Sequence, residues 1–140
     1  MKVKRIVFVN RAPFGNLDID FSDHQVVSLT GINGAGKTTI LTYIVDAFYE
    51  RAVFLDAHGH HKYADDAYLS SYSRLASAFT LLDYKDKNVK SRLDELMVLY
   101  KSFYKRLVKD DHIVSKQKIK LRLFRYFPRI HARVFPMRMK

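Results

Sequence analysis

The chain has 140 residues, a formal net charge of +11, no cysteine, and a content of 48% hydrophobic and 14% aromatic residues. This composition favours a folded domain over a disordered chain, and the lack of cysteine excludes a disulfide framework, a thiol nucleophile and a cysteine-based metal site. Neither a signal peptide nor an apolar run of about 18 residues is visible, so we expect a cytoplasmic protein with no membrane partner.

Two β-strands are expected at the start of the chain. Residues 2–9 are rich in β-branched side chains, which favours a strand. Residues 12–16 contain a proline and a glycine and predict a turn. Residues 17–21 alternate apolar and polar side chains, which predicts a half-exposed strand. The side chains of this strand that are expected to face inward are Leu17, Ile19 and Phe21.

A third expected strand, residues 25–29, leads directly into a glycine-rich segment. Residues 31–38 fit the pattern G-x-x-x-x-G-K-[ST] of the P-loop, which holds polyphosphates. The glycines let backbone N–H groups approach phosphate oxygens, Lys37 supplies a cation for the β- and γ-phosphates, and the Thr38 hydroxyl can bind Mg²⁺. Apolar residues recur at helical spacing after the loop, so a helix is expected to about Glu50.

This pattern predicts a binding site for ATP and Mg²⁺. A strand, a glycine loop and a helix in this order are the context that the motif requires, so a glycine turn without chemical meaning is disfavoured. Thr38 is also the predicted metal ligand, and no catalytic residue is predicted. The predicted nucleotide-binding residues are Asn33, Gly34, Ala35, Gly36, Lys37, Thr38 and Thr39.

The first third of the chain resembles the ABC-type ATPase heads of the RecF, SbcC and structural-maintenance-of-chromosomes group. The resemblance rests on the opening strand, residues 11–21, the P-loop with Asn33 before its middle glycine, and the helix start at Thr39, Ile40 and Leu41. It implies a P-loop NTPase-like α/β fold with a sheet of at least three strands. It also implies that the loop after the first strand lies near the nucleotide, so Arg11 is a further expected contact, with a solvated turn arginine as the alternative.

Two short segments after the first helix suggest other chemistry. Residues 52–56 look like a Walker B strand that ends in a Mg²⁺-binding Asp56. The connection from the helix is too short for a parallel neighbouring strand, so a loop or helix-end position is favoured for this acid. His58, His60 and His61 invite interpretation as a metal site, but no cysteine or firmly placed carboxylate accompanies them, and a solvated loop is favoured.

Two further helices are expected. Asp65 and Asp66 could open the first, although a strand is the alternative there. Its apolar residues at helical intervals are Leu69, Tyr72, Ala76, Phe79 and Leu82. The second helix has a capping box, Ser91 with Asp94, at its expected start. It carries a long apolar stripe that we expect to be core, made of Val89, Leu93, Leu96, Met97, Tyr100, Phe103, Tyr104 and Leu107.

Most of the positive charge lies at the C-terminal end. Residues 112–140 contain nine Lys or Arg and no Asp or Glu, so they carry +9, and residues 1–111 carry +2. We therefore divide the chain into the N-terminal portion of a P-loop ATPase head, residues 1–111, and a basic tail, residues 112–140. Within the tail, residues 118–123 alternate charged and apolar side chains and predict a strand. Its basic and aromatic residues would suit single-stranded nucleic acid, whereas a truncated or disordered terminus would have no such role.

The resembled heads complete their active site with a Q-loop glutamine, a signature segment from a second subunit, a Walker B Asp-Glu pair and a switch histidine. None is securely found here, since the adjacent Asp94 and Glu95 fall within the apolar helical stripe. We therefore expect the nucleotide-binding front of an incomplete ATPase head that acts in DNA repair, recombination or anti-phage defence. The expected partners are DNA and either a second ATPase subunit or a missing C-terminal half. The isolated chain should hydrolyse little or no ATP.

Two alternative functions stay open at this point. A stand-alone P-loop kinase or NTPase would usually place its P-loop after the first strand, and here two strands precede the P-loop strand. A non-catalytic basic adaptor would keep a vestigial nucleotide site and use its tail to bind nucleic acid or another anionic partner. Nucleotide titration, followed by ATP turnover with and without DNA, would separate the three functions.

Overall fold

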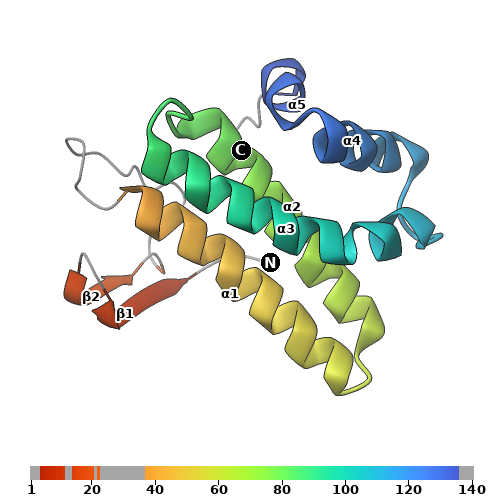
Figure 1. The fold of residues 1–140 in the computed structure, drawn as a ribbon. Coiled ribbons are helices and arrows are strands. Elements are labelled where there is room, and N and C mark those ends of the chain that lie inside the picture. Colours follow the sequence, from red (N-terminus) through yellow and green to blue (C-terminus); the bar gives the residue numbers. More distant parts are fainter. Residues whose placement is uncertain (1–3, 12–13, 21, 23–36, 136–140) are drawn as a thin grey trace. The chain divides into compact units, whose positions relative to one another are not determined.

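The computed structural model describes residues 4–11, 14–20, 22 and 37–135, and these residues form a mixed α/β protein (Figure 1). The described strands are β1 (Arg5–Arg11) and β2 (Phe14–Asp20). The described helices are α1 (Lys37–Ala57), α2 (His61–Leu81), α3 (Lys87–Lys109), α4 (Ser115–Tyr126) and α5 (Pro128–Val134). The chain divides into two compact units, Met1–Ile40 and Leu41–Lys140.

In the first unit, β1 and β2 pair antiparallel, with Phe8 opposite Leu17. Phe8 is buried while both of its neighbours in β1 are exposed, which is the alternation of side chains expected along a strand. Both predicted strands are therefore confirmed, but β2 starts earlier than expected and already includes residues 14–16. The predicted strand over residues 25–29 and the predicted inward position of Phe21 lie outside the described residues.

The helix α1 is longer than the sequence predicts, since it continues past Glu50 to Ala57. The added residues include neither glycine nor proline, so nothing in them stops the helix. Gly59 follows with a φ of +78°, in the left-handed region that glycine adopts at helix ends. Residues 52–56 are thus helical, which excludes a Walker B strand there and confirms the favoured helix-end position of Asp56.

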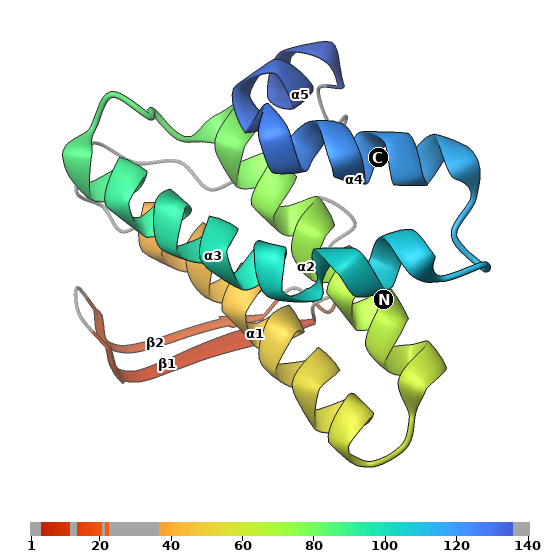
Figure 2. The same cartoon turned by 45° about the vertical axis from the view of Figure 1, so that its right-hand side comes forward.

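The helices α2 and α3 lie side by side in the second unit, as both views show (Figures 1 and 2). The helix α2 begins at His61, four residues before the expected start at Asp65, and the strand alternative for this segment is wrong. The helix α3 begins before Ser91 because the Asp86 carboxylate caps it by accepting hydrogen bonds from two N–H groups of the first turn. The capping box expected from Ser91 and Asp94 is therefore wrong.

The apolar stripe predicted in α3 is confirmed as core, because all eight of its residues are buried. In α2, Tyr72 and Ala76 are buried, and Leu69 and Phe79 pack partly buried against the same cluster. Leu82, also predicted in this stripe, is partly buried there too, but it lies directly after the end of α2. Recurrence of apolar residues at helical spacing therefore predicts both helices correctly, even though it does not predict where they begin.

The helix α4 replaces the strand that the alternation over residues 118–123 predicts, so that prediction is wrong. Leu121 and Phe124 lie three positions apart on one side of α4, and both are fully buried. Ile119 and Tyr126 lie on the other side and are exposed. A short alternating segment fits one side of a helix as well as one face of a strand, and burial of the pair against the core favours the helix.

The helix α5 follows directly and begins at Pro128, where the missing N–H of proline costs no helical hydrogen bond. It contacts α2 and α4, and α4 contacts α3. Helices on both sides of residue 111 therefore pack together, and the division of the chain at that residue stays a prediction. In the part of the chain that the structure describes, no helix combines the length and apolar character that a membrane span requires.

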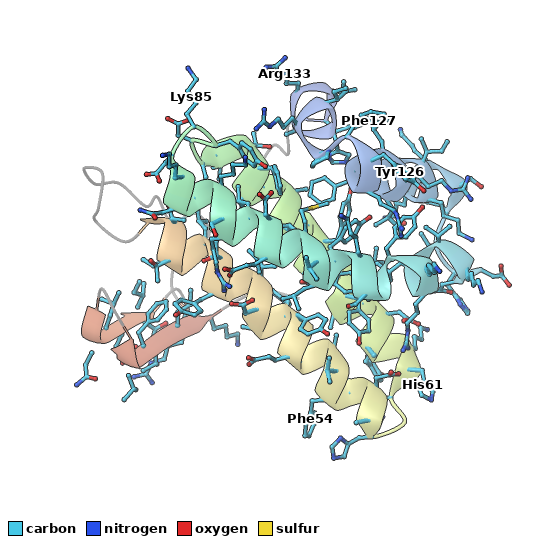
Figure 3. The ribbon with its side chains drawn as sticks, viewed as in Figure 1. Phe54, His61, Lys85, Tyr126, Phe127 and Arg133 are labelled. Atoms are coloured by element: carbon cyan, nitrogen blue, oxygen red, sulfur yellow. The ribbon has the colours of Figure 1, made fainter. Side chains whose placement is uncertain are left out.

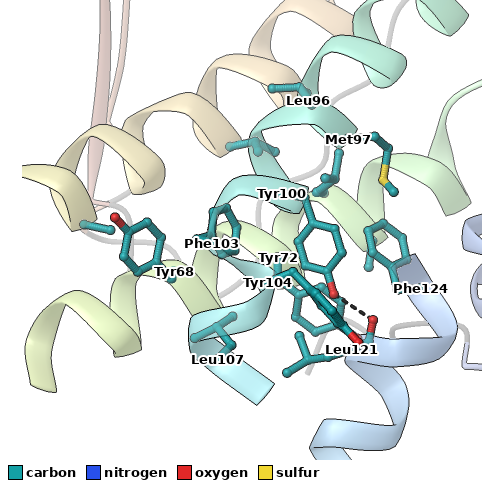
Figure 4. Packing of buried hydrophobic residues seen from close by; sticks show 14 of the residues in the cluster. Tyr68, Tyr72, Leu96, Met97, Tyr100, Phe103, Tyr104, Leu107, Leu121 and Phe124 are labelled. Carbon is teal, nitrogen blue, oxygen red and sulfur yellow. Dashed lines mark hydrogen bonds between the residues drawn. The ribbon is translucent and has the colours of Figure 1, made fainter. Parts of the chain in front are cut away.

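Aromatic side chains from α2, α3 and α4 meet at the centre of the core (Figure 4). The Tyr100 hydroxyl donates a hydrogen bond of 2.7 Å to the backbone oxygen of Leu121 and so ties α3 to α4. Burial raises the pKa of Tyr100, which keeps its hydroxyl protonated as a donor. The Phe124 ring meets the Tyr100 ring edge-on, with 5.2 Å between ring centres.

Candidate nucleotide-binding site

The first turn of α1 contains the last residues of the predicted P-loop. The helix begins at Lys37, so Thr38 and Thr39 lie in its first turn, as the motif predicts. The remaining predicted nucleotide-binding residues lie outside the described residues, and they are Asn33, Gly34, Ala35 and Gly36. The described part of the predicted site is therefore its helical half.

The N-terminal end of α1 suits an anion. The first four N–H groups of an α-helix have no acceptor within the helix, and this 21-residue helix has the positive end of its dipole here. Its first turn contains no acidic residue that would repel a phosphate. Thr38 is half-buried and supplies a hydroxyl of the kind that binds Mg²⁺ beside a phosphate. The described residues thus fit a magnesium polyphosphate.

Arg11, the further predicted contact, is the last residue of β1 and pairs with Phe14 of β2. Its backbone therefore belongs to the strand, and the loop that the family resemblance places near the nucleotide begins directly after it. A contact between Arg11 and the nucleotide stays a prediction.

An arginine of α3 binds Asp46 in the third turn of α1, and no sequence pattern predicts this contact. The Arg92 guanidinium donates hydrogen bonds to the carboxylates of Asp46 in α1 and of Glu95 in its own helix. It also lies 5.8 Å from the centre of the Tyr43 ring in α1. Burial raises the pKa of Asp46, and the nearby Arg92 opposes that shift. No local pattern identifies this ion pair, because its partners are 46 positions apart.

A second ion-pair cluster joins the other end of α1 to two helices. Arg106 of α3 lies 2.7 Å from the Asp56 carboxylate of α1 and 2.5 Å from the Asp65 carboxylate of α2. The Nδ1 atom of His61 lies 2.7 Å from the same Asp56 carboxylate. Hydrogen bonding to Arg106 is the largest cause of a lowered pKa for Asp56. Asp56 is therefore a structural carboxylate that connects three helices.

The histidines between α1 and α2 make local contacts. The Nδ1 atom of His58 lies 2.8 Å from the backbone oxygen of Phe54. The centres of the His58 and Phe54 rings lie 4.1 Å apart. His58 and His60 are exposed in the connection, which confirms the predicted solvated loop, whereas His61 begins α2. The described ranges of the chain contain no group of three or more potential metal ligands.

Asp56→Asn should lower the free energy of unfolding by about 1 kcal/mol, because a partly exposed carboxylate would lose its charge-assisted bonds to Arg106 and His61. It should leave the affinity for Mg-ATP unchanged. Urea denaturation and calorimetric titration measure the two quantities, and Asp111→Asn, at an exposed acid, is the control for charge. A tenfold loss of Mg-ATP affinity with unchanged stability would instead identify Asp56 as a metal ligand.

Comparison with known proteins adds one match to this geometry. A family model described as an AAA domain matches residues 5–130, which is most of the chain. The matched residues include the P-loop pattern and the helices α1 to α4. The family consists of AAA-type P-loop ATPase domains and falls in the group that contains RecF and structural-maintenance-of-chromosomes proteins. No curated protein and no solved structure matches the chain.

Proposed function

Because this chain belongs to the AAA domain family of P-loop ATPases, we propose that it binds Mg-ATP as the nucleotide-binding front of a RecF- or SbcC-like ATPase. The family match over residues 5–130 carries the proposal, since the P-loop pattern lies within the match. The described start of α1 supports it, because a helix N-terminus without acids follows the glycine segment directly.

The residues of the proposed site divide the work of holding the nucleotide. Backbone N–H groups of residues 33–36 surround phosphate oxygens, and those of Thr38 and Thr39 continue the same array at the start of α1. Lys37 places its ammonium group against the β- and γ-phosphates, and the Thr38 hydroxyl binds Mg²⁺. Arg11 reaches the nucleotide from the end of β1. When bound, Mg²⁺ neutralises part of the phosphate charge.

We further propose a role in DNA repair, recombination or anti-phage defence, together with a second ATPase subunit.

Efficient hydrolysis requires an acid that helps to hold the metal and a group that orients the attacking water. The candidates considered for this task in the sequence, Asp56 and the Asp94–Glu95 pair, all lie within helices. We therefore assign the missing acid to other residues of the assembled ATPase and expect turnover near background from this chain alone.

Lys37→Ala should weaken Mg-ATP binding by about 2 kcal/mol, roughly 30-fold, because the proposed site loses its fixed cation over the β- and γ-phosphates. Isothermal titration calorimetry with Mg-ATP measures this change. Lys87→Ala is the matched control, because Lys87 is also the first residue of a long helix, α3, but follows no glycine loop. The control should bind Mg-ATP like the parent, and equal affinity of the parent and Lys37→Ala would contradict the proposal.

A further inference from the structure

The helices α4 and α5 carry positive charge that no acidic residue in them offsets. Residues 115–135 contain seven Lys or Arg and no Asp or Glu. Among the described residues, none of these seven side chains forms an ion pair with a carboxylate. By contrast, Arg5, Arg92 and Arg106 each have an acidic partner. Clustered cations without acidic partners are typical of surfaces that bind a polyanion.

Two aromatic side chains are exposed beside these cations, at the junction of α4 and α5 (Figure 3). Tyr126 is 66% exposed and Phe127 is 55% exposed. The Arg125 guanidinium lies 5.6 Å from the centre of the Tyr126 ring. We call the exposed residues of this surface the arginine–aromatic face, and they are Arg122, Tyr126, Phe127, Arg129 and Arg133. Arg125 beside them is half-buried and lies 4.5 Å from the centre of the Tyr104 ring. The Arg129 guanidinium lies 3.8 Å from the centre of the Tyr84 ring, which leaves its edge for a ligand.

The core holds this face on a fixed support. Leu121 and Phe124 of α4 are fully buried, and so is His131 of α5. Because the inner sides of both helices are packed in the core, the side chains on their outer sides point away from it. The exposed rings and guanidinium groups are therefore carried by two anchored helices.

We propose that the arginine–aromatic face binds a single-stranded nucleic acid. Guanidinium groups are planar donors that match phosphate oxygens, and exposed aromatic rings stack on unpaired bases. A single strand offers both the phosphates and the free base faces, whereas a duplex keeps its bases stacked inside. None of these residues belongs to the predicted P-loop, so the inference goes beyond the proposed ATP binding and does not depend on it.

An anionic membrane fits the same face less well. A helix that lies on a bilayer inserts a continuous apolar side among the lipids. The apolar side of α4, which contains Leu121 and Phe124, is already buried in the core. In α4, exposed Ile119 lies between two lysines. In α5, Ile130 and Val134 are exposed, but this helix has only seven residues and each of the two lies next to an arginine, so no continuous apolar side results.

The test uses the full chain and fluorescent oligonucleotides of about 20 nucleotides, poly-dT and poly-U, with anisotropy measured between about 50 and 200 mM salt. The double variant Arg122→Gln with Arg129→Gln removes two phosphate contacts, each of which contributes a slope of roughly 0.7 to the log–log salt dependence. Binding at about 0.1 M salt should therefore be about 25-fold weaker than that of the parent. The slope should become shallower by about 1.4. Tyr126→Leu should weaken binding about fivefold or more without changing the slope.

The control is Lys90→Gln with Lys101→Gln, which removes the same charge from exposed positions of α3. It should change affinity less than about threefold, and the arginine double variant should keep the parent's circular dichroism spectrum and Mg-ATP affinity. Equal losses in the two double variants would overturn the inference. So would equal binding of a duplex, or binding of phosphatidylserine vesicles without binding of either oligonucleotide. Oligonucleotide binding by a chain that does not bind Mg-ATP would support this inference and contradict the proposed nucleotide site.

Discussion

Phe124→Ala should lower the free energy of unfolding by about 4 kcal/mol, because it removes a large buried ring and leaves a cavity between helices. Phe124 is fully buried in α4, although it belongs to a segment that the sequence describes as a basic tail. Its ring lies 5.1 to 5.5 Å, centre to centre, from rings of three other helices. These neighbours are Tyr72, Phe79, Tyr100 and His131.

The matched control is Phe127→Ala, the same substitution three positions later. Phe127 is 55% exposed, so its loss should cost less than about 1 kcal/mol. Urea denaturation of the parent and both variants gives the two differences. A small cost for Phe124→Ala, equal to that of the control, would mean that α4 does not contribute to the core in solution.

Acidification should destabilise the protein by about 3 kcal/mol through His131. Burial lowers the pKa of His131 to about 4, and the positive charge of Lys120 lowers it further. The Nε2 atom shares a hydrogen bond of 2.9 Å with the Tyr72 hydroxyl, which itself keeps its proton because burial raises its pKa. Nδ1 is buried and has no hydrogen-bond partner among the described residues. A protonated ring would therefore bury an N–H group without an acceptor.

The direction of this pH effect follows from the two pKa values of His131. Above pH 6.5, the usual pKa of histidine, the ring is neutral in the folded and the unfolded chain, so it adds no pH dependence. Between about pH 6.5 and pH 4 the unfolded chain binds a proton that the folded chain does not, so the free energy of unfolding falls by about 1.4 kcal/mol per pH unit. Below pH 4 both states are protonated and this fall ends.

His131→Phe should remove this part of the pH dependence, because phenylalanine fills a similar space and does not titrate. Urea denaturation at about pH 7 and pH 4.5 measures how much the free energy of unfolding falls in the parent and in the variant. At about 1.4 kcal/mol for each pH unit below 6.5, the parent should lose about 2 to 3 kcal/mol more than the variant. The control is His60→Phe, at an exposed histidine, which should keep the parent's pH dependence. An unchanged pH dependence in His131→Phe would contradict the burial of a neutral ring.

Three features of the fold differ from what local sequence patterns predict. The helix α1 runs seven residues beyond its predicted end, because those residues contain no stop signal before Gly59. The helix α3 starts earlier than the pattern from Ser91 predicts, because Asp86 is a better cap, whose carboxylate accepts two hydrogen bonds. The strand predicted over residues 118–123 was wrong because its alternation also fits a helix.

Features that depend on consecutive or regularly spaced residues can be predicted from the sequence alone. The P-loop pattern is one, because residues 31–38 of a single segment supply the glycines, the lysine and the hydroxyl that a phosphate requires. The buried stripe of α3 is another, because a helix brings residues three and four positions apart to one side. The chain's membership in the AAA domain family agrees with the P-loop pattern, whereas its resemblance to RecF or SbcC in particular stays a prediction.

Contacts between side chains that are far apart in the sequence depend on how the helices pack. Arg92 pairs with Asp46 across 46 positions, and Tyr72 meets His131 across 59. Such contacts depend on the packing of whole helices, and a local pattern contains no information about a partner so far away. The same holds for the basic segment, since its charge alone suggests a tail, whereas burial of Leu121 and Phe124 against neighbouring helices makes it part of the folded core.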